Sequence, residues 1–290
     1  MSLPSAPLRV ALIGAGTVGT ATAHLLSRRG HRTVGVASRS ASSARRAADL
    51  LGSSVFTLDD GLPEADLVLL GTPEAALEEL VSTMVPKLSP GRVIAHFAGV
   101  VGIDPLGRAA DVGAHTLALH PVQACPDVPT ALARLPGSAW GITSAPEIAE
   151  WADGLVREDL EGTPVRVSEE ARPLWHAAAA LTANGLTALL AVAEEMLLTA
   201  GVTETNEVLA PLASGVVANA VERGAGESLT GPIVRGDTAT IAAHVRALRN
   251  AGPLLEGYLY AARLTLSAAL LAGRLAPGTQ RALSEVLEGA

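Results

Sequence analysis

Basic and aromatic residues are scarce in this 290-residue chain. Its 21 lysines and arginines are outnumbered by 29 aspartates and glutamates, which gives a formal net charge of −8. The basic residues form no block that could contact a phosphate backbone. Three tryptophans, two tyrosines and two phenylalanines also provide little surface for stacking against bases. We therefore expect no nucleic-acid partner.

Cysteine is nearly absent as well, since Cys125 is the only one. A single cysteine cannot form an intrachain disulfide, which fits a reducing compartment. The first ten residues, MSLPSAPLRV, lack the basic segment, apolar core and cleavage site of an export signal. These features predict a cytoplasmic protein. Cys125 itself is expected to be a small buried apolar side chain rather than a nucleophile.

Charged side chains are missing from one long stretch, between His176 and Glu194. The apolar run at 177–193 is at the short limit for a membrane span. It contains Asn184 and Gly185, and it lacks flanking aromatic or basic anchors. We expect a core or interface helix here, and no membrane partner.

The N-terminal part of the sequence alternates short apolar runs with helical patterns. Apolar runs at 8–13 and 33–37 flank a glycine cluster and a helical segment, which predicts a strand, turn, helix and strand. The other expected elements are strands over 67–71, 91–99, 114–121, 138–143 and 163–167, and a helix over 146–156. Residues 1–167 are therefore predicted to form an α/β domain.

The sequence GAGTVG at 14–19 matches the pattern G-x-G-x-x-G between the first strand and its helix. Gly14 permits a tight turn, Gly16 lets the backbone approach a pyrophosphate, and Gly19 lets the helix pack on the strand. The N-terminus of the helix then faces the phosphates. In this context the motif predicts a Rossmann dinucleotide-binding domain. The expected cofactor contacts in the motif are Gly14, Gly16, Thr17, Val18 and Gly19.

The end of the second strand indicates which dinucleotide is bound. Ser38, Arg39 and Ser40 stand about 20 positions beyond the glycines, where an NAD-preferring site usually carries an acidic residue. Arg39 can pair with a 2′-phosphate, and the two serines can donate hydrogen bonds to it. We therefore predict NADP(H) as the cofactor. Thr72 and Pro73, at the end of the third strand, are expected near the nicotinamide ribose.

Beyond Val167 the sequence becomes rich in alanine and leucine and divides into helical segments. The expected helices cover 173–200, 205–223, 238–250, 253–274 and 279–288. Residues 168–290 are therefore predicted to form an all-α domain. An α/β domain followed by a helical one favours a ligand cleft between them.

One interhelical loop, LTGPIVRGD at 229–237, is chemically distinctive. Thr230, the amide of Gly231 and the guanidinium of Arg235 could hold a substrate carboxylate. A capped turn with a solvated arginine is an equally good interpretation, because Asp237 or the threonine after it can cap the next helix.

Taken together, these motifs resemble a bacterial family of Rossmann-like NADP oxidoreductases of unknown function. Its members carry the glycine loop, the SRS strand end, an HP motif, and a helix that begins HAAAA with an asparagine eight residues on. The resemblance covers almost the whole chain. It implies an NADP(H)-dependent reductase of a small carbonyl or imine substrate, and a homodimer formed through the helical domain. More distantly, the chain is similar to ketopantoate reductases, pyrroline-carboxylate reductases and prephenate dehydrogenases.

The resemblance to ketopantoate reductases places their catalytic lysine on His176 and their two helix asparagines on Ala180 and Asn184. It places their substrate-binding glutamate on Thr240. Only Asn184 is kept, so the chain is expected to differ from an ordinary ketopantoate reductase. A 2-oxo acid remains an expected kind of substrate.

The resemblance to prephenate dehydrogenases places their catalytic histidine on His120 of LALHPVQ, and Gln123 of that segment is a candidate substrate contact. The serine that accompanies that histidine is replaced near Ala98 and Gly99.

His120 and His176 are both candidate proton donors, because an imidazole can protonate the atom that gains charge as hydride arrives. Each could instead be a structural residue. On a helical wheel, His176, Ala180, Asn184 and Thr187 fall on one face, which is predicted to line the cleft. No histidine shows metal-ligand spacing with carboxylates, so no metal is expected. Two alternatives stay open: a non-redox or sensor protein that binds NADP(H) without turnover, and hydride exchange with a deazaflavin.

Overall fold

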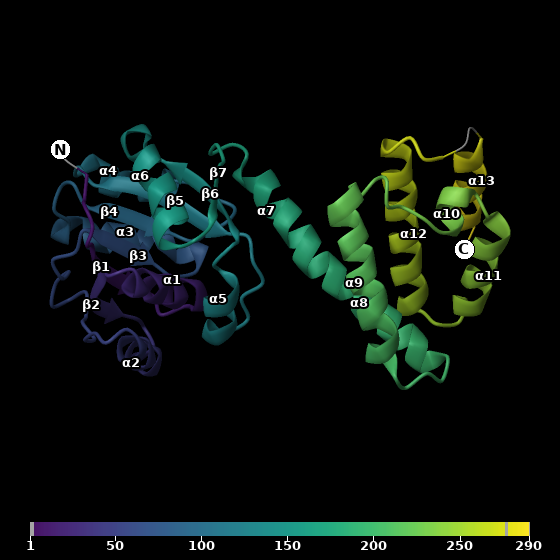
Figure 1. Cartoon of the computed structure of the whole chain (residues 1–290), viewed down its shortest axis with the longest axis horizontal. Helices are drawn as coiled ribbons and strands as arrows, with labels where there is room; N and C mark the ends of the chain where they lie inside the picture. The colour runs from purple at the N-terminus through teal and green to yellow at the C-terminus, as the bar shows by residue number, and fades with distance from the viewer. Residues whose placement is uncertain (1–2, 276–277, 290) are drawn as a thin grey trace. The chain divides into compact units, whose positions relative to one another are not determined.

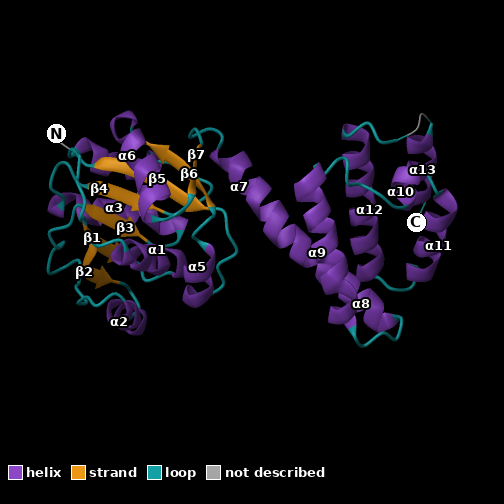
Figure 2. Cartoon of the chain, viewed as in Figure 1, coloured by secondary structure: helices purple, strands orange, loops and turns teal. Residues whose placement is uncertain are grey.

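The computed structural model of the protein describes residues 3–275 and 278–289. Contacts divide the chain into two units, residues 1–180 and 181–290. The first combines a β-sheet with helices and the second is helical, as predicted (Figures 1 and 2). The domain boundary at 167/168 stays a prediction, and helix α7 (Arg172–Ala180) falls within the first unit by its contacts.

Within the described residues, the first unit is built on one seven-stranded sheet of order β2-β1-β3-β4-β5-β6-β7. The strands are β1 (Arg9–Ile13), β2 (Arg32–Ala37), β3 (Leu67–Leu70), β4 (Val93–His96), β5 (His115–Pro121), β6 (Ala139–Ser144) and β7 (Thr163–Arg166). Strands β1 to β5 pair in parallel, β6 runs antiparallel to β5, and β7 is parallel to β6. The carboxyl ends of β1 to β5 therefore lie along one edge of the sheet.

Both faces of this sheet are buried. Val10 and Leu12 of β1 belong to a core cluster with residues of α1, α5 and α6, whereas Ala11 and Ile13 belong to a second cluster with residues of α3 and α4. Because successive side chains point to opposite faces, burial on both sides explains why the strands appear in the sequence as continuous apolar runs. The helical elements here are α1 (Thr17–Arg28), α2 (Ala41–Leu50), η1 (Glu74–Ala76), α3 (Leu77–Met84), η2 (Val85–Lys87), η3 (Asp104–Leu106), α4 (Gly107–Asp111), α5 (Val128–Arg134), η4 (Pro146–Ile148), α6 (Ala149–Gly154) and η5 (Leu155–Asp159).

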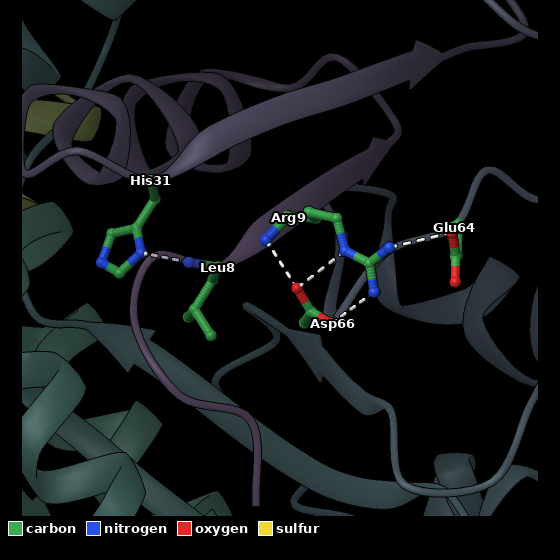
Figure 3. A network of polar contacts seen from close by, with 5 residues as sticks. All are labelled: Leu8, Arg9, His31, Glu64 and Asp66. Carbon is green, nitrogen blue, oxygen red and sulfur yellow. Dashed lines mark hydrogen bonds and ion pairs between the residues drawn. The ribbon is translucent and has the colours of Figure 1, made fainter.

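A polar network fastens the start of β1 at the opposite, amino-terminal edge (Figure 3). The Arg9 guanidinium donates to both carboxylate oxygens of Asp66, over 2.9 and 3.1 Å, and pairs with Glu64 at 2.9 Å. Its hydrogen bonds lower the pKa of the Asp66 carboxyl. The amide of Leu8 donates to Nδ1 of His31 over 2.9 Å. Since Asp66 directly precedes β3, this network ties β1 to its neighbour away from the carboxyl edge.

The helix predicted over 173–200 is present, but it is not uniform. It consists of α7, a π-helical turn η6 (Leu181–Gly185) and α8 (Leu186–Thr199). A π turn holds more residues than an α turn. The constant rotation of about 100° per residue assumed for the helical wheel therefore fails beyond Ala180. The wheel is not a valid basis for placing Asn184 and Thr187 on the face of His176.

The predicted helices after residue 200 are present close to their expected positions, as α9 (Thr205–Arg223), α11 (Thr238–Leu248), α12 (Pro253–Leu271) and α13 (Thr279–Glu288). A short helix that was not predicted, α10 (Pro232–Arg235), lies within the segment 229–237, which was expected to be a loop. Asp237 caps α11, because its carboxylate accepts a hydrogen bond from the amide of Thr240 at 3.0 Å. Ile241, Leu259 and Leu283 lie in the core of this unit.

Large apolar side chains nevertheless remain exposed on the helices of the second unit. On α9, Leu212 is 61% exposed, Val216 58% and Val221 83%. One helix among the described residues, 172–199, is long and apolar enough to span a membrane, and none of its most apolar window is buried in the chain. Length and composition alone are weak evidence for a span. These surfaces are, however, of the kind that a partner covers.

Candidate functional site

The glycine turn after β1 packs tightly against the end of β3. Gly14 has φ +89°, and a Cβ there would come within 2.6 Å of the backbone of Gly71. A Cβ on Gly16 would lie 2.8 Å from the Gly71 carbonyl oxygen, and one on Gly19 would lie 3.1 Å from the Gly71 Cα. The three glycines thus let the turn and α1 approach the neighbouring strand.

The N-terminus of α1 is open to an anion. Gly16 is the N-cap and provides no side-chain acceptor, and the first turn of this fully described helix contains no acidic residue. The first amides of the helix, including those of Thr17 and Val18, have no partner within an α-helix. They carry the positive end of the helix dipole, which attracts phosphate groups.

A pocket of about 690 Å³ opens over the carboxyl ends of β1, β2 and β3. Of the predicted cofactor residues, it is lined by Gly14, Gly16, Ser38, Arg39, Thr72 and Pro73. Ser40 instead caps α2, where its hydroxyl accepts from the amide of Ser43 at 3.3 Å. The carboxylates of Asp59 and Glu79 also line the pocket, so it is not uniformly cationic.

The residues present fit a dinucleotide with a 2′-phosphate. A side-chain-free turn and unpaired helix amides suit a pyrophosphate, and Arg39 supplies a cation at the end of β2, where an NAD site usually carries an acid. Ser38 and Thr72 line the same pocket, and the Thr72 hydroxyl oxygen is buried without a hydrogen-bond partner among the described residues.

Two predicted catalytic residues meet further along the same edge. His120 lies in β5 and His176 in α7, and their ring centroids are 5.6 Å apart at an interplanar angle of 69°. The indole Nε1 of Trp175 donates to Nδ1 of His120 over 3.1 Å. A Cβ on Gly99 would clash with the His176 ring and lie 2.9 Å from Nε2 of His120. The loop after β4 thus fits closely against both imidazoles.

His120 is uncharged in this environment. Burial, together with the nearby His176, Arg172 and His96, lowers its pKa to about 4. Near neutral pH the ring therefore carries one proton.

Arg172, at the start of α7, was not among the predicted site residues. It is fully buried and donates to the carbonyls of Ala118 at 2.9 Å and Gly141 at 3.0 Å, and to the Thr143 hydroxyl at 2.7 Å. Its Nη1 is buried with no hydrogen-bond partner among the described residues. Burial lowers the pKa of Arg172 to about 10. This cation joins α7 to β5 and β6 behind the two histidines.

His96 and Glu169 hold the loop that contains Gly99. His96 is fully buried, its Nδ1 accepts from the amide of Ala98 at 3.1 Å, and its Nε2 lies 2.6 Å from the Gly102 carbonyl oxygen. The Glu169 carboxylate accepts from the amides of Gly102 and Ile103, both at 2.7 Å. These contacts were also missed, because neither residue lies in a recognisable motif.

Gln123 was predicted to contact substrate, but its amide group is already engaged inside the first unit. It donates to the Ser138 hydroxyl at 3.2 Å and to the Arg134 carbonyl at 3.4 Å, and accepts from the amide of Ala124 at 2.9 Å. A structural role accounts for these contacts. Cys125 is half-buried, and burial raises the pKa of its thiol, as expected of an unreactive cysteine.

The other predicted substrate residues lie in the second unit. Asn184 is in η6, Thr230 and Gly231 precede α10, and Arg235 ends it. Both the amide and the hydroxyl of Thr240 donate to the Asp237 carboxylate, at 3.0 and 2.7 Å, so this side chain belongs to the cap of α11. Across the described residues, no group of three or more histidine, cysteine or acidic side chains is placed to hold a metal.

Strand order sets the distance between the glycine turn and the histidine pair. From β1 to β5 there are three strand steps, by way of β3 and β4. Neighbouring strands are about 4.8 Å apart, so the two sites lie roughly 14 Å apart along one edge of the sheet. The nicotinamide half of a dinucleotide, followed by the substrate, would have to span this distance.

Two family models match separate parts of the chain, and the second begins within the sheet of the first unit. A family model described as a Rossmann-like domain matches residues 2–121, and one described as a domain of unknown function (DUF2520) matches residues 138–265. A comparison with curated proteins finds no match.

Solved structures share the fold over most of the chain. A Bacteroides fragilis protein named "putative NADP oxidoreductase" is 24% identical, with a TM-score of 0.75, over 90% of this chain and 98% of its own. A reductive aminase of Aspergillus terreus in complex with NADPH and ethyl levulinate is 18% identical, with a TM-score of 0.63, over 96% of this chain and 99% of its own. The pyrroline carboxylate reductase of Plasmodium falciparum with NADP bound is 12% identical, with a TM-score of 0.60, over 90% and 98%. This chain is thus similar to Rossmann-like and DUF2520 domains in two parts of its length, and it shares its fold with these three proteins.

Proposed function

We propose that the protein is an NADP(H)-dependent oxidoreductase that reduces a small carbonyl or imine substrate, such as a 2-oxo acid. One observation carries the proposal: the His120 and His176 pair lies at the same carboxyl edge of the sheet as the glycine turn. In open α/β sheets, ligands bind outside the carboxyl ends of the strands.

Different residues of the chain would bind different parts of the nucleotide. The glycine turn and the first amides of α1 would hold the pyrophosphate, Ser38 and Arg39 the 2′-phosphate, and Thr72 and Pro73 the nicotinamide ribose. When bound and reduced, the nucleotide supplies a hydride. The histidines would then polarise the substrate and provide its proton.

For residues of the second unit we propose roles in binding and in dimerisation. Thr230, Gly231 and Arg235 are proposed to bind a substrate carboxylate, and Asn184 to bind the cofactor or the far end of the substrate. The exposed apolar side chains of α9 support a homodimer through this unit.

The alternative is a protein that binds NADP(H) without turnover. Two observations favour it: His176 stands where ketopantoate reductases carry their catalytic lysine, and Thr240, at the position of their glutamate, is used in a helix cap. A fold alone does not decide between these functions.

The decisive measurement is the consumption of NADPH by purified protein against a panel of 2-oxo acids, including ketopantoate, and cyclic imines. We expect turnover that prefers NADPH over NADH and falls about 10²–10⁴-fold in His176→Ala. His244→Ala, an exposed histidine in the second unit, is the matched control and should keep full activity. Tight NADPH binding without turnover of any substrate would favour the alternative.

A further inference from the structure

The contact between Trp175 and His120 determines which ring nitrogen of His120 carries the proton. An indole N–H can only donate a hydrogen bond. Because it points at Nδ1 of His120 over 3.1 Å, Nδ1 must be the unprotonated nitrogen. The neutral ring therefore carries its proton on Nε2. The indole packs directly against Gly141 of β6, because a Cβ at that position would lie only 2.7 Å from Trp175 Nε1. This contact holds the indole in place.

The protonated nitrogen of His120 lies on the side of the loop after β4 and of His176. Nε2 is the ring atom nearest to the position of a Cβ on Gly99, at 2.9 Å, and the same position lies against the His176 ring. No atom larger than hydrogen fits between Gly99 and the two rings, so the loop only packs against them. His120 is partly exposed, and its Nε2 is not among the buried polar atoms without a partner in the described part of the chain, which leaves its N–H accessible to a substrate atom.

The charged and titratable groups around His120 disfavour a second proton on its ring. Arg172 and His176 come from α7 and His96 comes from β4, and all three lower the pKa of His120 in addition to burial. The Arg172 cation is held permanently in place by the carbonyls of Ala118 and Gly141. An imidazolium at His120 would face this buried cation without a carboxylate partner among these groups.

We infer that His120 binds the substrate oxygen or nitrogen as a neutral Nε2–H donor, that His176 delivers the proton, and that Trp175 is the positioning residue that fixes the His120 tautomer. This division of roles rests on the proposed reductase function. The tautomer itself does not.

The chemistry balances with these roles. Hydride adds to the carbonyl carbon, a C–H bond forms, and the π electron pair of the C=O bond moves to oxygen. His120 stabilises the developing negative charge by its hydrogen bond and keeps its own proton. The protonated form of His176 gives its proton to the oxygen and becomes neutral. As a half-buried residue, His176 can take up a new proton from solvent.

The first test is ¹⁵N NMR of histidine-labelled full-length protein between pH 5.5 and 8, without ligand. We expect His120, identified from the signal lost in His120→Gln, to stay neutral with a protonated Nε2 and an unprotonated Nδ1. In Trp175→Phe, which keeps the aromatic volume but removes the donor, the signal should shift towards a mixture of tautomers. Trp151→Phe is the matched control, because the Trp151 indole donates to the Pro4 carbonyl instead.

A protonated Nδ1, or a charged His120 at pH 7, in the wild-type spectrum would overturn the inference whether or not the protein turns over any substrate. An unchanged His120 signal in a folded Trp175→Phe protein would also overturn the role of Trp175. Failure of the reductase proposal would appear separately, as binding of NADPH without consumption.

Kinetic measurements on variants then test the different roles of the two histidines. His120→Gln keeps a neutral N–H donor and should therefore lower kcat less than His120→Ala does. His176→Gln should lower kcat about 10²–10⁴-fold. Trp175→Phe should lower kcat with little change in KM. If His120→Gln lowered kcat as much as His176→Gln, the assigned roles would be wrong.

Discussion

At the scale of single residues, the burial of His96 makes the stability of the protein depend on pH. Burial lowers its pKa to about 4, against an ordinary value near 6.5. Between these two pH values the unfolded chain binds more protons than the folded one. The free energy of unfolding should therefore fall as the pH falls from 6.5 to 4, by an amount on the order of 3 kcal/mol.

Urea unfolding between pH 4 and 7 measures this loss. In His96→Gln the loss across the window should be clearly smaller, even though the variant is less stable at every pH. His244→Gln, at an exposed position, should show the wild-type slope. An unchanged slope in His96→Gln would contradict the prediction.

Arg39 should decide the preference between the two nicotinamide dinucleotides. A charge-assisted contact to a 2′-phosphate is worth about 1.5–3 kcal/mol, so Arg39→Ala should raise the Kd for NADPH roughly 10- to 100-fold. The Kd for NADH should hardly change, since it lacks that phosphate. Isothermal titration calorimetry checks both values, with the exposed Arg45→Ala on α2 as the control. Equal losses for NADPH and NADH would remove the assigned role from Arg39.

At the scale of structural elements, the turn between β1 and α1 cannot accept a side chain. Gly14→Ala places a Cβ within 2.6 Å of the Gly71 backbone at a positive φ, so it should destabilise the first unit and abolish NADPH binding. Gly154→Ala in α6 has no neighbouring atom within 4 Å and a helical backbone, and should leave stability equal or up to about 1 kcal/mol higher. Thermal unfolding and nucleotide titration of both variants test the contrast. Normal NADPH binding by Gly14→Ala would show that the turn does not hold the pyrophosphate.

The loop after β4 should depend on Glu169. Glu169→Gln replaces one carboxylate oxygen, which accepts a backbone amide, by an amide group that cannot accept it. We expect a loss of about 1–3 kcal/mol in the free energy of unfolding, and a lower activity because Gly99 is no longer held against the histidines. Glu170→Gln, at the exposed neighbouring position, should be close to wild type in urea unfolding. Matching behaviour of the two variants would mean that the hydrogen bonds of Glu169 contribute nothing to stability.

The elements themselves could largely be predicted from the sequence, because buried parallel strands and the helices that cover them leave strong periodic patterns. The π turn η6 could not. It lies in the run LTANG, inside a stretch so uniformly apolar that no change of period marks it. The error affected Asn184 directly, since a wheel drawn with a uniform α-helical period misplaces it.

At the scale of the whole molecule, the exposed apolar face of α9 should form the contact between two copies. Leu212→Glu combined with Val216→Glu would place two carboxylates in an apolar interface, where they cost several kcal/mol. We expect a wild-type dimer and a folded monomeric variant in analytical ultracentrifugation. Val55→Glu, which is 46% exposed in the first unit, is the control and should remain dimeric. A wild-type monomer at micromolar concentration would contradict the proposed dimer.

The two candidate proton donors could be predicted from motifs, but their contact and the residues that support them could not. His176 follows from the resemblance to ketopantoate reductases, and His120 from the resemblance to prephenate dehydrogenases. Trp175, Arg172 and Glu169 act through contacts with strands and loops more than 25 positions away in the chain. No local pattern encodes such contacts, and so only the structure identifies them.

The packing of α7 also limits how the two halves of such proteins can be recombined. Arg172 and Trp175 follow residue 167 in the chain, yet their partners lie on β5 and β6 of the sheet. A chimera joined at residue 168 would combine a foreign α7 with the native His120 and separate the imidazole from the indole selected to match it. A junction at residue 181 would keep the set intact and exchange only the remaining helices. In the evolution of new specificities by exchange of C-terminal halves, α7 is therefore expected to be inherited together with the sheet.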